Sequence, residues 1–160
     1  MANIALPSSP PPLEMPHSVL FICNFNAVRS AMAEALTKYY CGHHIFTDSC
    51  GIRAEEDNAN PFAIFVMDEI GLDISRHSPK RFENLMDSSF DLVVTLSPEA
   101  HHKAIDLTRT QDCQVEYWPT LDPTAVMGNR ENIISAFRQT RDMLTDRIKR
   151  RFDVGYSPAI

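Results

Sequence analysis

A cysteine, an arginine and a serine stand close together where an apolar run gives way to a helical pattern. Cys23 directly follows the run 18–22, and Arg29 and Ser30 come six and seven residues later. A tight loop at 24–29 that leads into a helix would turn its backbone N–H groups toward one point, where the helix dipole also favours an anion. Arg29 is able to hold two oxygens of that anion in a bidentate fork, which a lysine cannot form. The stretch therefore predicts a site for a tetrahedral oxyanion such as phosphate.

The same turn predicts a nucleophile. Its positive field favours the thiolate of Cys23, the nucleophilic form of a cysteine, and the Ser30 hydroxyl is suited to donate a hydrogen bond to it. These residue types predict covalent catalysis on a phosphate. The alternative interpretation is structural: a buried thiol at the end of a strand, and a serine that only caps a helix.

Strands and helices alternate around this turn. Short apolar runs predict strands, and helical periodicity predicts helices. Two of these helices begin with an Asn-Pro or Ser-Pro pair, in which the first residue caps the helix and the proline takes its first position. Such alternation implies an α/β domain in which a four-stranded parallel sheet has helices on both faces. Cys23, Ser97 and Asp122 each follow a predicted strand, so we expect them at the carboxyl edge of the sheet, where ligands bind in such folds. The predicted strands are 18–22, 44–50, 90–96 and 113–118, and the predicted helices are 30–40, 61–70, 80–87, 98–107 and 130–152.

Length and composition fit one globular domain. The chain has 160 residues and a net charge of −6, and we expect a domain at 17–153, a disordered Pro/Ser-rich tail at 1–16 and a C-terminal tail at 154–160. The acidic balance argues against nucleic-acid binding, and no apolar run reaches the roughly 18 residues of a membrane span. The cysteines and histidines show neither disulfide nor metal-ligand spacing, and the tail does not read as a signal peptide. We therefore expect a cytoplasmic protein with no metal and no cofactor.

Four motifs in order along the chain resemble one family. They are VLFICNFNAVRSAMAEAL at 19–36, DSCGIRA at 48–54, IGLDISRHSPKRF at 70–82 and WPTLDPTAVMG at 118–128. The first contains C-x-x-N-x-x-R-S followed by M-A-E-A, which resembles the low-molecular-weight protein tyrosine phosphatase superfamily, including the thioredoxin-coupled arsenate reductases. The resemblance covers about residues 17–152. It implies a phosphatase I-like fold with strand order 2-1-3-4.

The resemblance also implies a role for each site residue. Cys23 would form a thiophosphate intermediate, Arg29 would hold the equatorial oxygens, and Asp122 would protonate the leaving oxygen and later activate water. Asn26 would brace the loop, and His77 would lie behind it. The expected phosphate-binding residues are Asn24, Phe25, Asn26, Ala27, Val28, Arg29 and Ser30.

Two departures from the family pattern bear on the pocket wall. Thr124 and Ala125 follow the Asp-Pro pair, where tyrosine phosphatases of this type carry aromatic residues that wall the pocket for a phenyl ring. Phe25 stands where a glycine is usual, and we expect it to project outward as a replacement wall, because a Phe adopts positive φ only at a cost. A preference for phosphotyrosine is therefore left open.

A third departure concerns the type of reaction. The thiol relay of the thioredoxin-coupled reductases needs cysteines at the positions of Val28 and Ser97.

The main hypothesis is a cysteine-dependent phosphatase that acts on a phosphorylated protein or a small phosphoester. The alternatives are an arsenate reductase that uses an external low-molecular-weight thiol, and a non-catalytic regulator that binds phosphate.

Overall fold

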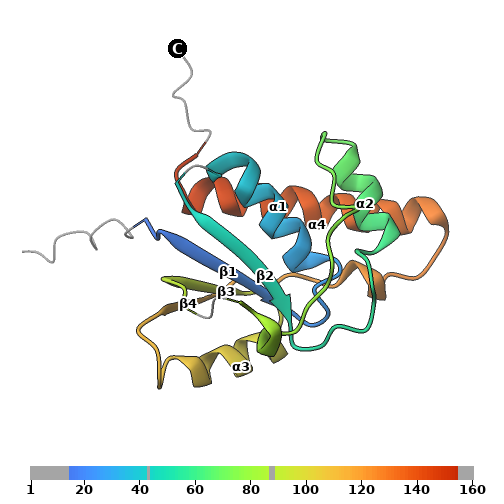
Figure 1. The fold of residues 1–160 in the computed structure, drawn as a ribbon. Helices are drawn as coiled ribbons and strands as arrows, with labels where there is room; N and C mark the ends of the chain where they lie inside the picture. Colours follow the sequence, from blue (N-terminus) through green and yellow to red (C-terminus); the bar gives the residue numbers. More distant parts are fainter. Residues whose placement is uncertain (1–14, 43, 87–88, 155–160) are drawn as a thin grey trace, which may run out of the picture.

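A sheet of four parallel strands forms the centre of the molecule. The computed structural model describes residues 15–42, 44–86 and 89–154 (Figure 1). The strand order is β2-β1-β3-β4, so the predicted fold class and the predicted order are confirmed. The inner strand β1 is covered on both faces, and its residues 19–23 are buried. The strands are β1 (Ser18–Cys23), β2 (Phe46–Gly51), β3 (Leu92–Thr95) and β4 (Gln114–Tyr117).

Helices cover both faces of this sheet. Figure 1 shows α1, α2 and α4 on one side and α3 on the other. α1 packs on β1, β2 and α4, whereas α2 packs on α4. The larger core lies between the sheet and α1 and α4, and the smaller one lies under α3. The helices are α1 (Arg29–Cys41), α2 (Pro61–Asp68), α3 (Pro98–Leu107) and α4 (Arg130–Arg151), with single 3-10 turns η1 (Phe82–Asn84) and η2 (Pro123–Ala125).

The helix predicted at 80–87 is wrong. Only Phe82–Asn84 form a 3-10 turn, and residue 87 lies outside the described residues. The reason is tertiary: Gly51 N donates to Lys80 O at 2.8 Å, and Arg81 forms a parallel bridge with Gly51. The backbone at residues 80 and 81 therefore extends the end of β2, and only one 3-10 turn follows it.

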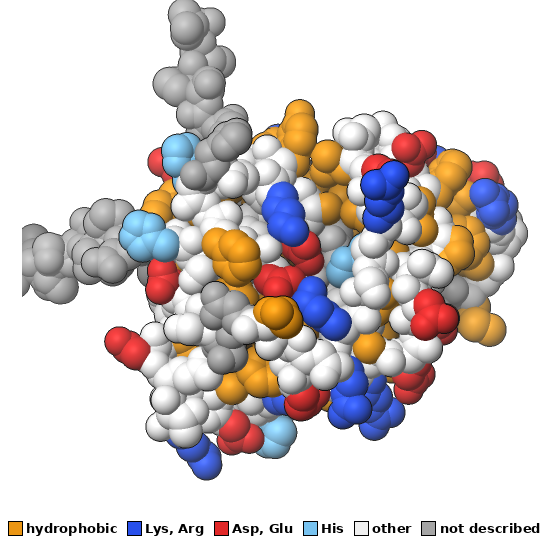
Figure 2. Space-filling model, in the orientation of Figure 1, with side chains coloured by type: hydrophobic (Ala, Val, Ile, Leu, Met, Phe, Trp, Pro, Cys, Tyr) orange, Lys and Arg blue, Asp and Glu red, His pale blue; other side chains and the backbone are white. Residues whose placement is uncertain are grey.

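The two expected tails fall almost wholly outside the described residues. Of the segment 1–16 the structure describes residues 15 and 16, and of the segment 154–160 it describes Val154. In the described ranges, the helices are all too short or too polar to cross a bilayer. The same ranges contain no group of three or more His, Cys, Asp or Glu residues that could hold a metal ion. Figure 2 shows acidic and basic side chains interspersed over one face of the molecule.

An ion-pair cluster ties α2 to α4. Glu69, which follows α2, accepts hydrogen bonds from Arg138 Nη2 at 2.7 Å and from Arg141 Nη1 at 2.8 Å. Arg141 Nη1 also donates to Val66 O at 2.7 Å. The hydrogen bonds from Arg138, followed by those from Arg141, lower the pKa of Glu69 to about 2. The cluster therefore fixes α2 to α4.

Glu69→Gln is expected to lose a pH-dependent part of the stability. The ordinary pKa of Glu69 is 4.5 and its folded value is about 2. The carboxylate therefore stabilises the fold above about pH 4.5, and this contribution is lost as the pH falls from 4.5 toward 2. Thermal unfolding should show a lower Tm for the variant at pH 7 and a smaller difference at pH 3. Asp68→Asn, next to it and exposed, is the control, and an equal Tm difference at both pH values would contradict the prediction.

Candidate active site

The N-terminus of α1 differs from those of the other helices. Asn60, Ser97 and Asn129 cap α2, α3 and α4 with their side chains, whereas α1 follows Val28 with no side-chain cap. In the loop before α1, the six backbone N–H groups of residues 24–29 donate to no group in the described part of the chain. Unpaired N–H groups at a helix start attract an anion, and the helix dipole adds to their field. This loop therefore has the donors of an oxyanion site.

Asn26 fixes the shape of the loop. It is buried and adopts φ 57°, a left-handed conformation that asparagine tolerates better than most residues. Its Nδ2 donates to Ser30 Oγ at 2.8 Å and to Ser49 Oγ at 2.9 Å, and its Oδ1 accepts from Lys80 N at 3.0 Å. His77 Nε2 donates to the backbone oxygen of Asn26 at 2.8 Å. The loop is thus held from β2 and from the segment 77–80.

The thiol of Cys23 lies within this network. Its Sγ is 2.9 Å from Ser30 Oγ and 3.5 Å from Ser30 N. Because Ser30 Oγ already accepts from Asn26, its own hydrogen can point to the sulfur, although Cys50 O lies at 3.3 Å as a second acceptor. Two donors at the sulfur stabilise a thiolate. Cys23 is 2% exposed and belongs to the larger core cluster, and it also lines a pocket.

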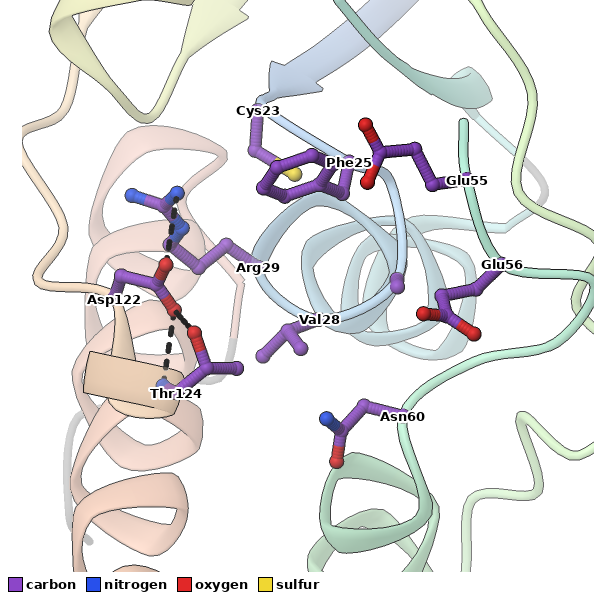
Figure 3. Close-up of a pocket in the computed structure, with 10 residues that line it drawn as sticks. Cys23, Phe25, Val28, Arg29, Glu55, Glu56, Asn60, Asp122 and Thr124 are labelled. Atoms are coloured by element: carbon purple, nitrogen blue, oxygen red, sulfur yellow. Dashed lines mark hydrogen bonds and ion pairs between the residues drawn. The ribbon is translucent and has the colours of Figure 1, made fainter. Parts of the chain in front are cut away.

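Arg29 and Asp122 lie next to each other on one side of that pocket, whose volume is about 180 Å³. Arg29 is 5% exposed, and its Nη1 donates to Thr120 O at 2.9 Å. Its Nη2 lies 3.9 Å from Asp122 Oδ2. Asp122 Oδ1 accepts from Thr124 N at 2.9 Å and from Thr124 Oγ1 at 2.7 Å (Figure 3). Thr124 therefore orients the carboxylate through Oδ1. The other oxygen, Oδ2, accepts no hydrogen bond from the described residues and has Arg29 Nη2 as its neighbour at 3.9 Å.

The pocket brings together residues that are far apart in the sequence. Cys23 comes from the end of β1, Arg29 from the start of α1, and Asp122 from the loop before η2. Three further residues predicted to bind phosphate, Phe25, Ala27 and Val28, line the same pocket.

The remaining predicted residues lie around the pocket. Asn24 Oδ1 accepts from Ser97 Oγ at 2.6 Å, whereas Asn26, Ser30 and His77 hold the loop from behind, as the contacts above describe.

Phe25 lies on the wall of the pocket. It does not adopt a positive φ; in the described part of the chain, the non-glycine residues that do are Asn26 and Asp153. Its ring is 38% exposed and borders the space next to Cys23 (Figure 3). The left-handed position of the loop is therefore Asn26, and Phe25 forms part of the pocket wall.

Sequence reasoning missed several residues of the site. Glu55, Glu56 and Asn60 line the pocket, and Ser49 supports Asn26. Gly51 is also required, because a Cβ there would lie 2.8 Å from the carbonyl carbon of Phe25 and 2.9 Å from Asn24 O. The motif DSCGIRA contains Ser49 and Gly51 and offered a signal for both, whereas no pattern marked the two glutamates.

The chain belongs to the low molecular weight phosphotyrosine protein phosphatase family, whose profile matches residues 18–152. It is an enzyme of that family. The arsenate reductase of Bacillus subtilis (strain 168) is 33% identical over 137 residues, which cover 86% of this chain and 96% of that protein. The arsenate reductase of Halalkalibacterium halodurans is also 33% identical over 137 residues, with the same shares of the two chains.

Solved structures of both kinds of protein share the fold. An arsenate reductase in the phosphate-binding state is 28% identical, has a TM-score of 0.66, and covers 85% of this chain and 96% of its own. The tyrosine phosphatase Wzb from Escherichia coli K30 in complex with sulphate is 20% identical, has a TM-score of 0.69, and covers 87% of this chain and 98% of its own. At that identity the second likeness supports the fold alone.

Proposed function

We propose that the protein is a cysteine-dependent phosphatase that hydrolyses phosphate monoesters through a cysteinyl-phosphate intermediate. One observation carries the proposal: the Cys23 sulfur, the Arg29 guanidinium and the Asp122 carboxylate line one pocket, beside a loop whose N–H groups have no partner among the described residues. Phosphate binding alone requires neither a nucleophile nor an acid, which argues against a regulator that only binds phosphate. The domain at 17–153 would be the whole catalytic unit.

The first half of the reaction is attack by the thiolate. Cys23 Sγ forms a bond to phosphorus while the bond between phosphorus and the leaving oxygen breaks, and Asp122 gives its proton to that oxygen. The loop N–H groups and Arg29 hold the three equatorial oxygens, on which the transition-state charge is spread. Before the attack, the Ser30 hydroxyl, 2.9 Å from the sulfur, stabilises the thiolate.

The second half of the reaction is hydrolysis of the intermediate. Asp122, now ionised, takes a proton from a water molecule as that water attacks phosphorus. The sulfur–phosphorus bond breaks, inorganic phosphate leaves, and both the thiolate and the protonated acid are restored. The cycle balances without a metal or a redox partner.

A phosphorylated protein or a small phosphoester in the cytoplasm is the proposed substrate. The four cysteines are free thiols, which is compatible with a reducing compartment. Hydrolysis of p-nitrophenyl phosphate tests the proposal directly, since this substrate needs only the pocket itself. An inert protein that still binds phosphate would favour the regulator.

Arsenate reduction with an external thiol is the second candidate, favoured by the names of the relatives at 33% identity. An internal thiol relay has no support here. Val28 and Ser97 occupy the relay positions, and Ser97 is engaged with Asn24 and caps α3. Burial raises the pKa of the Cys41 thiol, and that of Cys50 well above the usual range, which makes both poor nucleophiles. Arsenite production that depends on glutathione, with negligible phosphatase turnover, would favour this candidate.

Asp122→Ala is expected to lower kcat/KM for phenyl phosphate, which reports the step that releases the leaving group, by about 10² to 10⁴, the usual contribution of a general acid. The loss should be much smaller for 2,4-dinitrophenyl phosphate, whose leaving oxygen needs no proton. Steady-state kinetics on both substrates measure the difference, and Asp73→Asn, an exposed carboxylate outside the pocket, is the control. An equal loss on the two substrates would mean that Asp122 is not the acid.

A further inference from the structure

The mouth of the pocket carries an excess of negative charge. Of the ten residues that line the pocket, three are carboxylates, Glu55, Glu56 and Asp122, and one, Arg29, is a cation. Figure 3 shows Asp122 next to Arg29 on one side and the two glutamates on the other. The two glutamates disfavour a phosphate dianion, so they need an explanation that the proposed reaction does not provide.

Glu55 and Glu56 have no counter-ion in the described part of the chain. Neither carboxylate forms an ion pair there, not even with the neighbouring Arg53, and both residues are exposed. Asp122 differs, because it has Arg29 at 3.9 Å and two hydrogen bonds from Thr124. The charge of the two glutamates is therefore available to whatever occupies the mouth.

The segment that carries the two glutamates is tied to the phosphate loop. Ile52 N donates to Cys23 O at 3.1 Å, and Arg53 N donates to Asn24 O at 2.9 Å. At the other end, Asn60 N donates to Ala27 O at 2.9 Å. Because the backbone is fixed to the loop on both sides of residues 55 and 56, their carboxylates stay close to the bound substrate.

The pocket has room for only part of a substrate. Its volume of about 180 Å³ is below the roughly 300 Å³ of the smallest sites for drug-sized ligands. A phosphorylated side chain can occupy it, with the Phe25 ring as one wall, while the groups next to that side chain must lie at the mouth. There they meet Glu55 and Glu56.

Resting on the proposed function, we infer that Glu55 and Glu56 select phosphoprotein segments in which Arg or Lys stands beside the phosphorylated side chain. A substrate cation at the mouth is attracted by the glutamates and by the bound phosphate. A substrate carboxylate is repelled by both, so the preference arises as much from exclusion as from attraction. A positive charge on the substrate thus neutralises the two glutamates, which lack a counter-ion among the described residues.

The test uses the full chain and three phosphotyrosine peptides of equal length, with Arg, Ala or Glu on both sides of the phosphotyrosine. We expect kcat/KM to be about tenfold higher for the Arg peptide than for the Glu peptide at low salt, mostly through KM, since exposed ion pairs are individually weak. The ratio should shrink as salt shortens the range of the interaction. In the double variant Glu55→Gln/Glu56→Gln the ratio should fall to about twofold or less. Asp106→Asn/Asp112→Asn, which removes the same charge at the far end of the sheet, should keep it.

The outcomes separate the two proposals. A ratio near one in the unaltered protein, or an unchanged ratio in the glutamate variant, would overturn the selection while leaving the phosphatase in place. Hydrolysis of p-nitrophenyl phosphate but of none of the peptides would also overturn it, because Glu55 and Glu56 would then not select any of the phosphotyrosine segments by their charge. No hydrolysis of any of these substrates would overturn the proposed function itself.

Discussion

Cys23→Ser is expected to lower the hydrolysis of p-nitrophenyl phosphate by about 10⁴-fold or more, the scale seen when a covalent nucleophile is removed. A serine hydroxyl stays protonated next to Ser30, so the hydrogen bonds and the N–H field that favour a thiolate have no anion to stabilise. The change is nearly isosteric, so Tm should stay close to that of the unaltered protein. Steady-state kinetics and thermal unfolding measure the two effects.

Cys113→Ser is the matched control for this experiment. Cys113 is partly buried, its burial raises the pKa of its thiol, and it does not line the pocket of Cys23. Its variant should keep full activity. Acid quenching during turnover should also trap phosphate on the unaltered protein and not on the Cys23 variant. Near-normal turnover by Cys23→Ser would contradict the assignment of the nucleophile.

The part of the site that the sequence could predict is the part that is local. Cys23, Arg29 and Ser30 belong to one strand–loop–helix unit, so their spacing alone places them around a single turn. Asp122 is distant in sequence, and it could be placed by the rule that parallel strands end at one edge of the sheet and by the family motif at 118–128. The family motifs then gave His77 a position behind the loop, where its ring contacts Asn26.

The part that the sequence could not predict depends on the path of irregular backbone. Glu55 and Glu56 lie in a segment without regular structure, and they reach the pocket because that segment is hydrogen-bonded to Asn24 and Ala27. The helix expected at 80–87 failed for a related reason. Lys80 N donates to the Asn26 side chain, and such a long-range contact overrides a local helical pattern. The missed residues and the failed helix thus have the same cause. The loop at 24–29 forms hydrogen bonds with backbone groups that are distant in the sequence.

Arg29→Lys is expected to lower kcat/KM for p-nitrophenyl phosphate by about 10² to 10³, the scale for removing one donor that acts on transition-state charge. The charge is kept, but a lysine cannot hold Thr120 O and two phosphate oxygens at once, because it lacks the planar fork of the guanidinium. Inhibition by orthovanadate, which also binds as an oxyanion, should weaken in parallel. Both effects follow from geometry, since the net charge of the pocket does not change.

A matched substitution and a stability measurement separate this effect from misfolding. Arg29 is buried and bonded to Thr120 O, so its replacement also costs some stability, and assays should be run well below the Tm of the variant. Arg130→Lys, at an exposed position at the start of α4, should leave kcat/KM unchanged. If Arg29→Lys retained wild-type kcat/KM and vanadate affinity, a single positive charge would be sufficient at this position. The bidentate grip on the phosphate would then be wrong, even if Cys23 were still the nucleophile.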